Sequence, residues 1–596
     1  KLFARGQWQL AAEVAERVRE PGAGLVLQRR LARNMAAMAE HQPLACQAIT
    51  QSVDACQYQL VKVEDGRFAV VQQPPQGTAL RFGPALLELP ESALVPLHEA
   101  LEKHEAGCGV AICGMGDGAL ARHLVKHHWM FWGKFRVEPM VYVIEPDAGL
   151  VLHHFMVEDF SQKDGPIRRG NCRWLVGERW GNDLLELLKQ QPTLRHPKLK
   201  IPQGRLGKAL FGKLDESTEH LVQQLETKRD EIWKRYPVLE LRELADLLGD
   251  APPRQPRVMF ITSRLTTVLQ FANLDCQRAF EAMGWATRLL MEPSAYEDTS
   301  PAYLLQQIDD FKPDVLFMID SLRFHASCVF PPQVLHVCWV QDDLPRLINT
   351  EAGQSIGERD FVALPAGPWY CKRFDYPAGQ CIFLDKLTHV QSKPVKWVQD
   401  GDDLVFVTNA GKPAPTLVRE IMDEYRQAVP MVRQLIERVT TDMIRLYDRG
   451  NHLHSPVQIR QLIQEEQHKQ GWAFNQASAM DQLVTILVSR FNNALYRQQV
   501  VRWLMDIASR HHLKLSLYGS GWSENPEFAA HARGTVAYGA DLEELTRRSK
   551  INMQVVPFGC MHQRLLMVWS LVDFFSCVNI RGIGSCQRSG RWCIRL

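Results

Sequence analysis

Two glycines, a histidine and an arginine near the C-terminal end of the chain have types and a spacing that suit phosphate chemistry. Gly519 and Gly521 follow one predicted strand, and His562 and Arg564 follow the next. Glycines at a strand end let the backbone come close to a ligand. Backbone amides and a guanidinium group match the oxygens of a diphosphate, which predicts a phosphate-bearing ligand. An ordinary turn with a surface arginine is the alternative, because short glycine-rich turns are weak signals.

Alternating strands and helices must position these residues. Residues 513–517 alternate apolar and polar side chains and are predicted to form a strand, and residues 550–556 form the next one. Between them a short strand is expected at 536–539, and a helix at 541–549 with Asp541 as its N-cap. This order predicts a parallel α/β unit, whose ligand site lies at the carboxyl ends of the strands.

A glycine-rich turn in the first third of the chain indicates a second nucleotide site. An apolar strand and a helix flank Gly114, Gly116 and Gly118, and a second strand, residues 140–144, ends at Glu145. Glycine turn, helix, strand and terminal acid are the layout of a dinucleotide or S-adenosylmethionine site. The separation of Gly114 and Glu145 exceeds the usual spacing of about 20 residues. The alternative is therefore a Rossmann-like accessory domain whose glycines only allow close packing.

Acidic side chains at another strand end could act as a general base. Asp342 and Asp343 follow the apolar residues 334–340 and are predicted to lie at a cleft. A carboxylate there could take the proton of an acceptor hydroxyl during group transfer, or it could cap the next turn. Polar residues that follow the predicted strand 257–261 could contact acceptor or donor across this cleft, or form a structural loop. They are Ser263, Arg264 and Thr266.

Several of these pieces occur in a fixed order. The C-terminal pieces are Gly519-Ser520-Gly521-Trp522, Tyr538-Gly539, Ser549-Lys550-Ile551-Asn552 and His562-x-Arg564; the upstream pieces are Lys312-Pro313-Asp314 and Trp339-x-x-Asp342-Asp343. The first set resembles the nucleotide-binding half of GT-B glycosyltransferases, most closely the CgeB-like (spore-maturation type) group, and the second set resembles the N-terminal half of that group. The resemblance spans roughly residues 256–566 and leaves residues 1–250 unexplained.

The resemblance implies two Rossmann-like lobes and transfer of a sugar from a nucleotide-diphosphate donor to a glycan or glycoprotein acceptor. It implies donor contacts at the C-terminal pieces, including Ser520 and Trp522, with Tyr538 and Gly539 near the nucleobase or ribose. One of the two adjacent aspartates would be the catalytic base. Such enzymes need no metal or other cofactor, because amides and cations of the protein stabilise the leaving diphosphate.

Composition narrows the class of protein. The 596 residues are 46% hydrophobic and 23% charged, as in a globular protein of several domains. A formal net charge of +2 gives no electrostatic reason to expect nucleic acid as a partner. The chain has no apolar run of about 18 residues, so no membrane span is predicted. The cysteines are scattered and form no CxxC pairs, which favours reduced thiols in the cytoplasm. No HExxH motif or Cys/His cluster has zinc spacing, so no metal site is expected.

The expected fold class is α/β, with a GT-B-like pair of Rossmann-like domains, the second truncated, preceded by an accessory Rossmann-like domain and a small α+β region. The expected parts are an N-terminal helical and hairpin region (1–105), the accessory domain with a helical tail (106–250), a linker (251–256), the N-terminal lobe (257–404), and the donor-binding lobe with a helical insertion (405–566). Residues 567–576 still have the character of a packed segment, but the tail from there to residue 596 shows no clear amphipathic period and no cap pattern. With compatible codons, a shift of one base at Met567 gives Asp-Gly-Leu-Glu-Pro-Gly-Gly-Phe-Phe-Leu, the helix, turn and strand that the resemblance implies here. We therefore hypothesise a frameshifted tail, with which the chain would bind donors poorly or be inactive.

The sequence is also compatible with two other functions. One is an S-adenosylmethionine- or dinucleotide-dependent enzyme built on the first glycine turn, for which loss of cofactor binding in a Glu145→Ala variant would be evidence. The other is a non-catalytic glycan-binding or scaffold protein, for which a chain that binds a glycan but never cleaves a donor would be evidence.

Overall fold

The computed structural model describes most of the chain. The described residues are 23–52, 58–62, 68–72, 80–82, 91–102, 104, 107–131, 135–203, 207–266, 268–326, 328–342, 344, 346–365, 367–384, 387–388, 401–426, 428–474, 477–555, 563–571 and 576–578. The chain divides into two compact units: residues 1–270, 280–317 and 326–335 form the first, and residues 271–279, 318–325 and 336–596 form the second.

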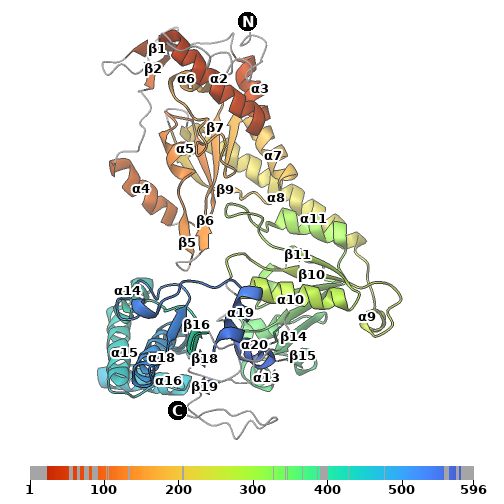
Figure 1. Cartoon of the computed structure of the whole chain (residues 1–596). Coiled ribbons are helices and arrows are strands. Elements are labelled where there is room, and N and C mark those ends of the chain that lie inside the picture. Colours follow the sequence, from red (N-terminus) through yellow and green to blue (C-terminus); the bar gives the residue numbers. More distant parts are fainter. Residues whose placement is uncertain are drawn as a thin grey trace. The chain divides into compact units, whose positions relative to one another are not determined.

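A four-stranded parallel sheet lies at the centre of the first unit (Figure 1). Its order is β8-β7-β4-β9, with strands β4 (Gly109–Cys113), β7 (Met140–Glu145), β8 (Cys172–Val176) and β9 (Pro197–Pro202). Its helices are α5 (Ala119–Leu124), α6 (Ala148–Val157) and α7 (Trp180–Gln190). Every residue of β4 and β7 is buried, as expected for a parallel sheet with both faces covered. The two strands predicted here from the sequence are confirmed.

Two N-terminal helices complete the core of this sheet. They are α2 (Ala23–His41) and α3 (Pro43–Gln51). Met35 of α2 belongs to the same buried cluster as Val110 and Val141 of the sheet. The Asn34 side-chain amide donates to the backbone oxygen of Phe155 at 2.9 Å, which fixes α2 against α6. These helices therefore share one hydrophobic core with the Rossmann-like sheet.

Smaller elements surround this core. They are β1 (Tyr58–Lys62), β2 (Phe68–Gln72), β3 (Leu80–Phe82), α4 (Glu91–Glu102), β5 (Trp129–Phe131) and β6 (Phe135–Val137). β1 and β2 pair antiparallel, with Tyr58 opposite Gln72 and Lys62 opposite Phe68, which confirms the predicted hairpin. The helical segment predicted after the sheet is two helices, α8 (Leu210–Arg235) and α9 (Leu241–Leu248), after a 3₁₀ turn at Gly207–Ala209. A capping box of Glu240 and Glu243 starts α9.

A six-stranded sheet has the order β11-β10-β12-β13-β14-β15. Its strands are β10 (Arg257–Ile261), β11 (Ala286–Leu290), β12 (Val315–Ile319), β13 (Leu335–Trp339), β14 (Asp360–Leu364) and β15 (Cys381–Phe383). The helices and 3₁₀ turns between them are α10 (Leu269–Ala282), α11 (Pro301–Phe311), η3 (Arg323–Ala326), α12 (Thr350–Gln354), α13 (Gly367–Phe374) and η4 (Ala378–Gln380). The pairs β10–β11, β13–β14 and β14–β15 are parallel, and the predicted alternation of strands and helices is confirmed.

A second parallel sheet, in the second unit, has the order β17-β16-β18-β19. Its strands are β16 (Leu404–Val407), β17 (Leu515–Tyr518), β18 (Ile551–Val555) and β19 (Ser576–Val578). Its helices are α14 (Ala414–Glu424), α15 (Pro430–Asp448), α16 (Pro456–Gln470), α17 (Ala477–Ile486), α18 (Asn493–His511), α19 (Ala540–Arg548) and α20 (Gln563–Leu571). In Figure 1, α14, α15, α16 and α18 lie on one side of β16 and β18, and α19 and α20 lie on the other.

The helical insertion between β16 and β17 has its own apolar core. Leu417 and Ile421 of α14 are buried in one cluster with Leu404 and Phe406. Their spacing of four residues places both side chains on one face of the helix. A π-helical turn at Leu487–Asn492 joins α17 to α18. Because Oδ1 of the Asn492 side chain accepts a hydrogen bond from the Tyr447 hydroxyl at 2.9 Å, this turn is tied to α15. The insertion is thus a packed helical layer on the sheet.

Three local predictions differ from the structure. Residues 536–539 form no strand, because Tyr538 instead turns its side chain onto α10. The N-cap of α19 is Gly539 rather than Asp541: the Gly539 carbonyl accepts from the Glu543 amide at 2.9 Å, and its φ of 93° suits glycine. The pattern after the glycine turn predicts a helix over residues 119–128, but α5 ends at Leu124 and tighter turns carry the chain onward.

The residues that follow the hypothesised frameshift point continue the helix. Met567, Val568 and Leu571 of α20 are buried in a cluster with Leu542 and Leu565. The helix therefore packs across that point, and the frameshift stays a hypothesis that the DNA sequence around Met567 tests. Among the residues that the structure describes, no helix has the length and apolar character needed to cross a bilayer. The cysteines with described side chains are free thiols.

Candidate anion-binding site

The loops that follow β16 and β17 lie against each other at the carboxyl edge of their sheet. The Thr408 amide donates to the Tyr518 oxygen at 2.8 Å, and the Ala410 amide donates to the Ser520 oxygen at 3.0 Å. The Ser520 hydroxyl donates to Asn409 Oδ1 at 2.9 Å. β16 has β17 on one side and β18 on the other, so the strand order reverses here. Open parallel sheets bind ligands at such a reversal.

The two glycines of the β17 loop are required by this close contact. Gly519 has a φ of 132°, and a Cβ atom there would lie 2.0 Å from the Thr408 oxygen. Gly521 has a φ of 86°, and its Cβ atom would lie 3.2 Å from Cβ of Ala410. Both glycines therefore serve the fold of the loop, whatever they bind. This structural role explains the Gly-x-Gly pattern from which the site was predicted.

Trp522 supports the loop from within the core. Its side chain is fully buried and touches the Phe528 ring edge-on, with ring centroids 5.4 Å apart. Its indole N–H donates to the Thr408 oxygen at 2.6 Å. A fully buried ring has no surface for a ligand, so the structure places Trp522 beneath the loop and not among the groups that could contact a donor.

Two arginines that influence each other electrostatically belong to this region. Arg564 lies in the first turn of α20, the next described element after β18, and Arg497 comes from α18. Arg497 Nη1 donates to the Asn409 oxygen at 2.8 Å. Burial, and then the charge of Arg497, lower the pKa of Arg564 to about 10, and burial also lowers the pKa of Arg497. Two neighbouring guanidinium groups that are both partly desolvated form a strong attractor for an anion.

The remaining predicted site residues lie away from this loop or outside the described part of the chain. His562 and Asp343 are outside the described residues. The Tyr538 ring stacks on Phe271 of α10 with centroids 4.4 Å apart, and its hydroxyl donates to Asp275 Oδ2 at 2.5 Å. Burial and this hydrogen bond raise the pKa of Tyr538. The structure therefore gives Tyr538 a fixed contact with α10.

A buried aspartate that the sequence interpretation did not single out holds Asp342. Asp320 follows β12 with a φ of 55° and no exposed surface. Its Oδ1 accepts from the Gln341 amide at 2.7 Å and from the Asp342 amide at 3.1 Å. Burial raises the pKa of Asp320 to about 6. The side chain of Asp342 is exposed, so Asp320 positions the backbone that presents it.

Asp320 gives a testable pH effect. Its raised pKa means that the folded protein keeps a proton that the unfolded chain has already lost, so wild-type stability falls as the pH rises towards about 6. An asparagine carbonyl still accepts from both amides but does not titrate. The stability of Asp320→Asn relative to wild type should therefore rise between about pH 4 and pH 6, by up to about 1.4 kcal/mol per pH unit. Urea unfolding across this range measures it; a constant difference would contradict it.

His336 should produce a slope of the opposite sign. Its side chain lies buried in β13, and burial, then the charges of Arg323 and His325, lower its pKa to about 3. Unfolding frees the imidazole to bind a proton, so stability falls as the pH drops from about 6.5. His336→Phe should remove up to about 1.4 kcal/mol per pH unit of this loss. The same change at the exposed His468 is the control, and equal slopes in both variants would refute the assignment.

The loop after β10 is held by a second unpredicted acid. The Ser263 hydroxyl donates to Glu292 Oε1 at 2.7 Å, and the Arg264 amide donates to Glu292 Oε2 at 2.8 Å. The Thr266 hydroxyl donates to the Ser263 oxygen at 2.9 Å and accepts from the Gln270 amide at 3.1 Å. The polar groups of this loop are thus engaged with one another, which agrees with the structural alternative.

The glycine turn of the first unit is filled by the protein itself. Both carboxylate oxygens of Glu145 accept backbone amides, from Met115 at 2.8 Å and from Asp147 at 3.0 Å. Cβ atoms at Gly114 and Gly116 would meet Gln203 at 2.4 and 3.0 Å, respectively. A Cβ atom at Gly118 would lie 2.5 Å from the Phe160 ring. Glu145 therefore fixes the turn, and these glycines allow close packing.

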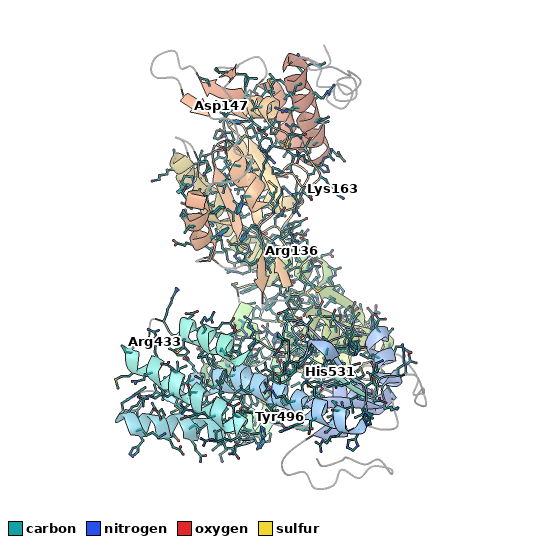
Figure 2. All side chains as sticks on the ribbon, turned by 60° about the vertical axis from the view of Figure 1, so that its left-hand side comes forward. Arg136, Asp147, Lys163, Arg433, Tyr496 and His531 are labelled. Carbon is teal, nitrogen blue, oxygen red and sulfur yellow. The ribbon has the colours of Figure 1, made fainter. Side chains whose placement is uncertain are left out.

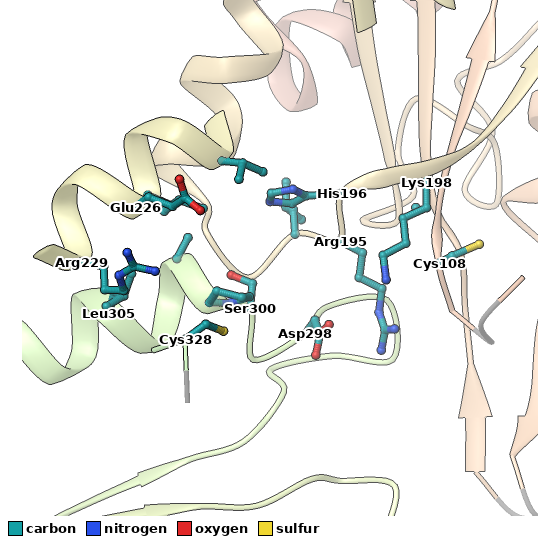
Figure 3. A pocket seen from close by; sticks show the side chains of 16 residues that line it. Cys108, Arg195, His196, Lys198, Glu226, Arg229, Asp298, Ser300, Leu305 and Cys328 are labelled. Carbon is teal, nitrogen blue, oxygen red and sulfur yellow. The ribbon is translucent and has the colours of Figure 1, made fainter. Parts of the chain in front are cut away.

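Described residues of the first unit line cavities of a size that could hold a ligand. One, of about 800 Å³, opens where β7 and β8 end and is lined by Asp147, which Figure 2 labels, and by Arg179. Another, of about 430 Å³, lies between the end of the sheet and helices α8 and α11 (Figure 3). Its charged lining includes Arg195, Lys198 and Glu226. Arg195 already donates to the Glu297 oxygen at 3.3 Å.

Comparisons with protein-family models, with curated proteins and with solved structures gave no match to this chain. The α/β architecture with several parallel sheets is established by the structure.

Proposed function

We propose that the second unit binds the diphosphate of a nucleotide-activated sugar and that the chain is a glycosyltransferase. The observation that carries this proposal is a basic site at the strand-order reversal of a parallel sheet: Arg497 binds the Asn409 oxygen beside the Gly519–Gly521 loop, and its charge acts on Arg564. An anion of two charges between two guanidinium groups relieves their repulsion and accepts several charge-assisted hydrogen bonds. The order of motifs that resembles the CgeB-like glycosyltransferases supports the same ligand class.

In this proposal the protein's cations stabilise the leaving diphosphate as the bond to the sugar breaks. Asp342, exposed at the end of β13, is the proposed base that accepts the proton of the acceptor hydroxyl. Asp343, its neighbour in the sequence, stays the alternative base. Asp320 acts as a positioning residue, because its carboxylate is buried and holds the Asp342 amide. The acceptor is a glycan or glycoprotein.

A ligand panel tests the proposal. UDP, GDP, TDP, S-adenosylmethionine and NAD are each added in excess, and the melting temperature is measured. A ligand that binds only the folded state stabilises it by about 2.7 kcal/mol at 100 times its dissociation constant. We expect stabilisation by a nucleoside diphosphate. A response confined to S-adenosylmethionine or NAD would contradict the assignment. Binding without release of nucleotide from any sugar donor would indicate a non-catalytic glycan-binding protein.

The cavity of about 800 Å³ in the first unit favours a second candidate function. It lies where ligands bind in Rossmann-like sheets, and Arg179 and Asp183 line it. As the second candidate, we propose that this cavity binds an S-adenosylmethionine- or dinucleotide-type ligand. Both oxygens of the buried Glu145 carboxylate already accept backbone amides, which argues against a contact between this acid and a ligand ribose. In the same panel, an Arg179→Ala variant would lose the response if this cavity is the site.

A further inference from the structure

Three histidines of the first unit converge on one point outside both sites above. His98 lies on α4, His123 lies on α5, and His127 follows α5. One ligand nitrogen from each lies within 4.8 Å of the other two. The ring centroids are 5.7 Å apart for His98 and His123, 5.8 Å for His98 and His127, and 6.5 Å for His123 and His127. No carboxylate is a member of this group.

The fold brings the three rings together through the packing of α4. Leu97 and Leu101, four residues apart on α4, are buried in the same cluster as Leu124 and Val125 at the end of α5. His98 is the neighbour of Leu97 and therefore lies at the border of this contact. His123 and His127 are also four apart, and hydrogen bonds continue the turns between them: the Lys126 amide donates to the His123 oxygen and the His127 amide to the Leu124 oxygen, both at 3.1 Å.

The two partly buried members of the trio have ring nitrogens that lack a hydrogen-bond partner among the described residues. Nε2 of His123 and Nε2 of His127 are buried and have no hydrogen-bond partner among the described residues. Buried polar atoms are nearly always hydrogen-bonded, so two adjacent exceptions point to a missing partner. Burial lowers the pKa of His127 to about 4 and also lowers the pKa of His123. Neutral imidazole is the form that coordinates a metal.

We propose that His98, His123 and His127 bind one divalent transition-metal ion, with zinc as the best match. Imidazole nitrogens suit zinc, copper and nickel, whereas calcium and magnesium require oxygen ligands. Three nitrogen ligands leave a fourth tetrahedral position for water or a further ligand. Nitrogens about 2.0 Å from zinc lie roughly 3.3 Å apart in a tetrahedron, so binding draws the three rings together. The ion thereby fastens α4 to the end of α5.

Cobalt titration of the full chain tests this site. The purified protein is stripped with a chelator, and Co²⁺ is added while visible absorption is followed, because tetrahedral Co²⁺ with nitrogen ligands absorbs strongly. We expect saturation at one equivalent and loss of the signal when Zn²⁺ is added. Altering only outer-shell partners weakens metal sites by about 10- to 100-fold. Loss of a ligand in His98→Ala or His127→Ala should therefore weaken affinity by about 100-fold or more.

His128→Ala is the matched control. His128 is exposed, lies next to His127 and is outside the trio, so its removal should leave the Co²⁺ affinity unchanged. His98→Ala keeps the test independent of folding, because the side chain of His98 is exposed and its loss creates no cavity; its melting temperature without metal checks this. No saturable absorption in wild type, or equal weakening in His128→Ala and His98→Ala, would overturn the proposal.

Discussion

Replacing Arg564 by alanine should weaken the binding of a nucleoside diphosphate by about 100-fold. The charge of Arg497 acts on Arg564, and Arg497 itself donates to the Asn409 oxygen beside the loop that contains Ser520. A hydrogen bond to a charged group contributes about 1.5–3 kcal/mol, and 1.4 kcal/mol is a tenfold change in affinity. Two such bonds from one guanidinium group account for the expected loss. Isothermal titration calorimetry with the nucleotide that responds in the ligand panel measures it.

The variants Arg564→Lys and Arg433→Ala sharpen this result. Lysine keeps the charge but lacks the planar fork, so Arg564→Lys should recover only part of the affinity. Arg433 is an exposed arginine on α15, labelled in Figure 2, and its removal should change nothing. High salt should reduce the affinity less than it would at a solvent-exposed site, because desolvated charges are poorly screened. Equal affinities of wild type and Arg564→Ala would remove the basis for the diphosphate assignment.

Placing a methyl group on Gly519 should destabilise the second unit by at least about 3 kcal/mol, a cost typical of severe backbone strain and overpacking. The new Cβ atom would lie 2.0 Å from the Thr408 oxygen, and that oxygen belongs to a strand end that cannot move alone. The φ of 132° adds strain for any residue with a side chain. Differential scanning fluorimetry of Gly519→Ala gives the shift in melting temperature, and urea unfolding gives the free energy.

A neighbouring glycine separates the steric cost from the conformational cost. Gly534 has a φ of 82°, yet a Cβ atom there would meet nothing within 4 Å. Gly534→Ala should therefore cost only about 1–2 kcal/mol, the price of the left-handed conformation. If Gly519→Ala proves no worse than Gly534→Ala, the contact between the β16 and β17 loops is looser than the structure shows.

The sequence predicted the order of strands and helices well because that information is local. Apolar runs such as 257–261 and 315–319, bounded by proline, glycine or charged residues, are strands in the structure. The hairpin at Tyr58–Gln72 was equally readable from its two short apolar runs. Each of these patterns depends on residues only a few positions apart, so no knowledge of tertiary contacts was needed.

Side-chain roles were harder to predict because they depend on distant partners. Trp522 sits in a motif beside two glycines, but its burial comes from Phe528 and from β16. Tyr538 is held by α10, far away in the sequence. Asp320 could have been noticed as an acid at the end of an apolar strand, the same signal that drew attention to Asp342. Its hydrogen bonds to another strand end could not have been foreseen.

The histidine trio shows the same limit. The spacing of His123 and His127 was visible in the sequence as two histidines four residues apart, a helical signal for a shared face. The third member, His98, comes from a separate helix, and nothing local links it to the other two. Zinc motifs with sequence-near ligands are recognised by their spacing, whereas this group exists only after α4 has packed onto α5.

The turn at Gly114 also has a use in protein engineering. The backbone oxygen and the side-chain amide of Gln203 occupy the space that the turn's glycines leave open. The backbone N–H of Gln203 donates to the backbone oxygen of Cys113 at 2.8 Å. The domain thus carries its own substitute for a ligand, supplied by the residue that follows β9. Shortening that side chain in Gln203→Ala would empty part of a preformed cradle and leave the backbone hydrogen bond in place. A scaffold of this kind is a starting point for designing a nucleotide receptor.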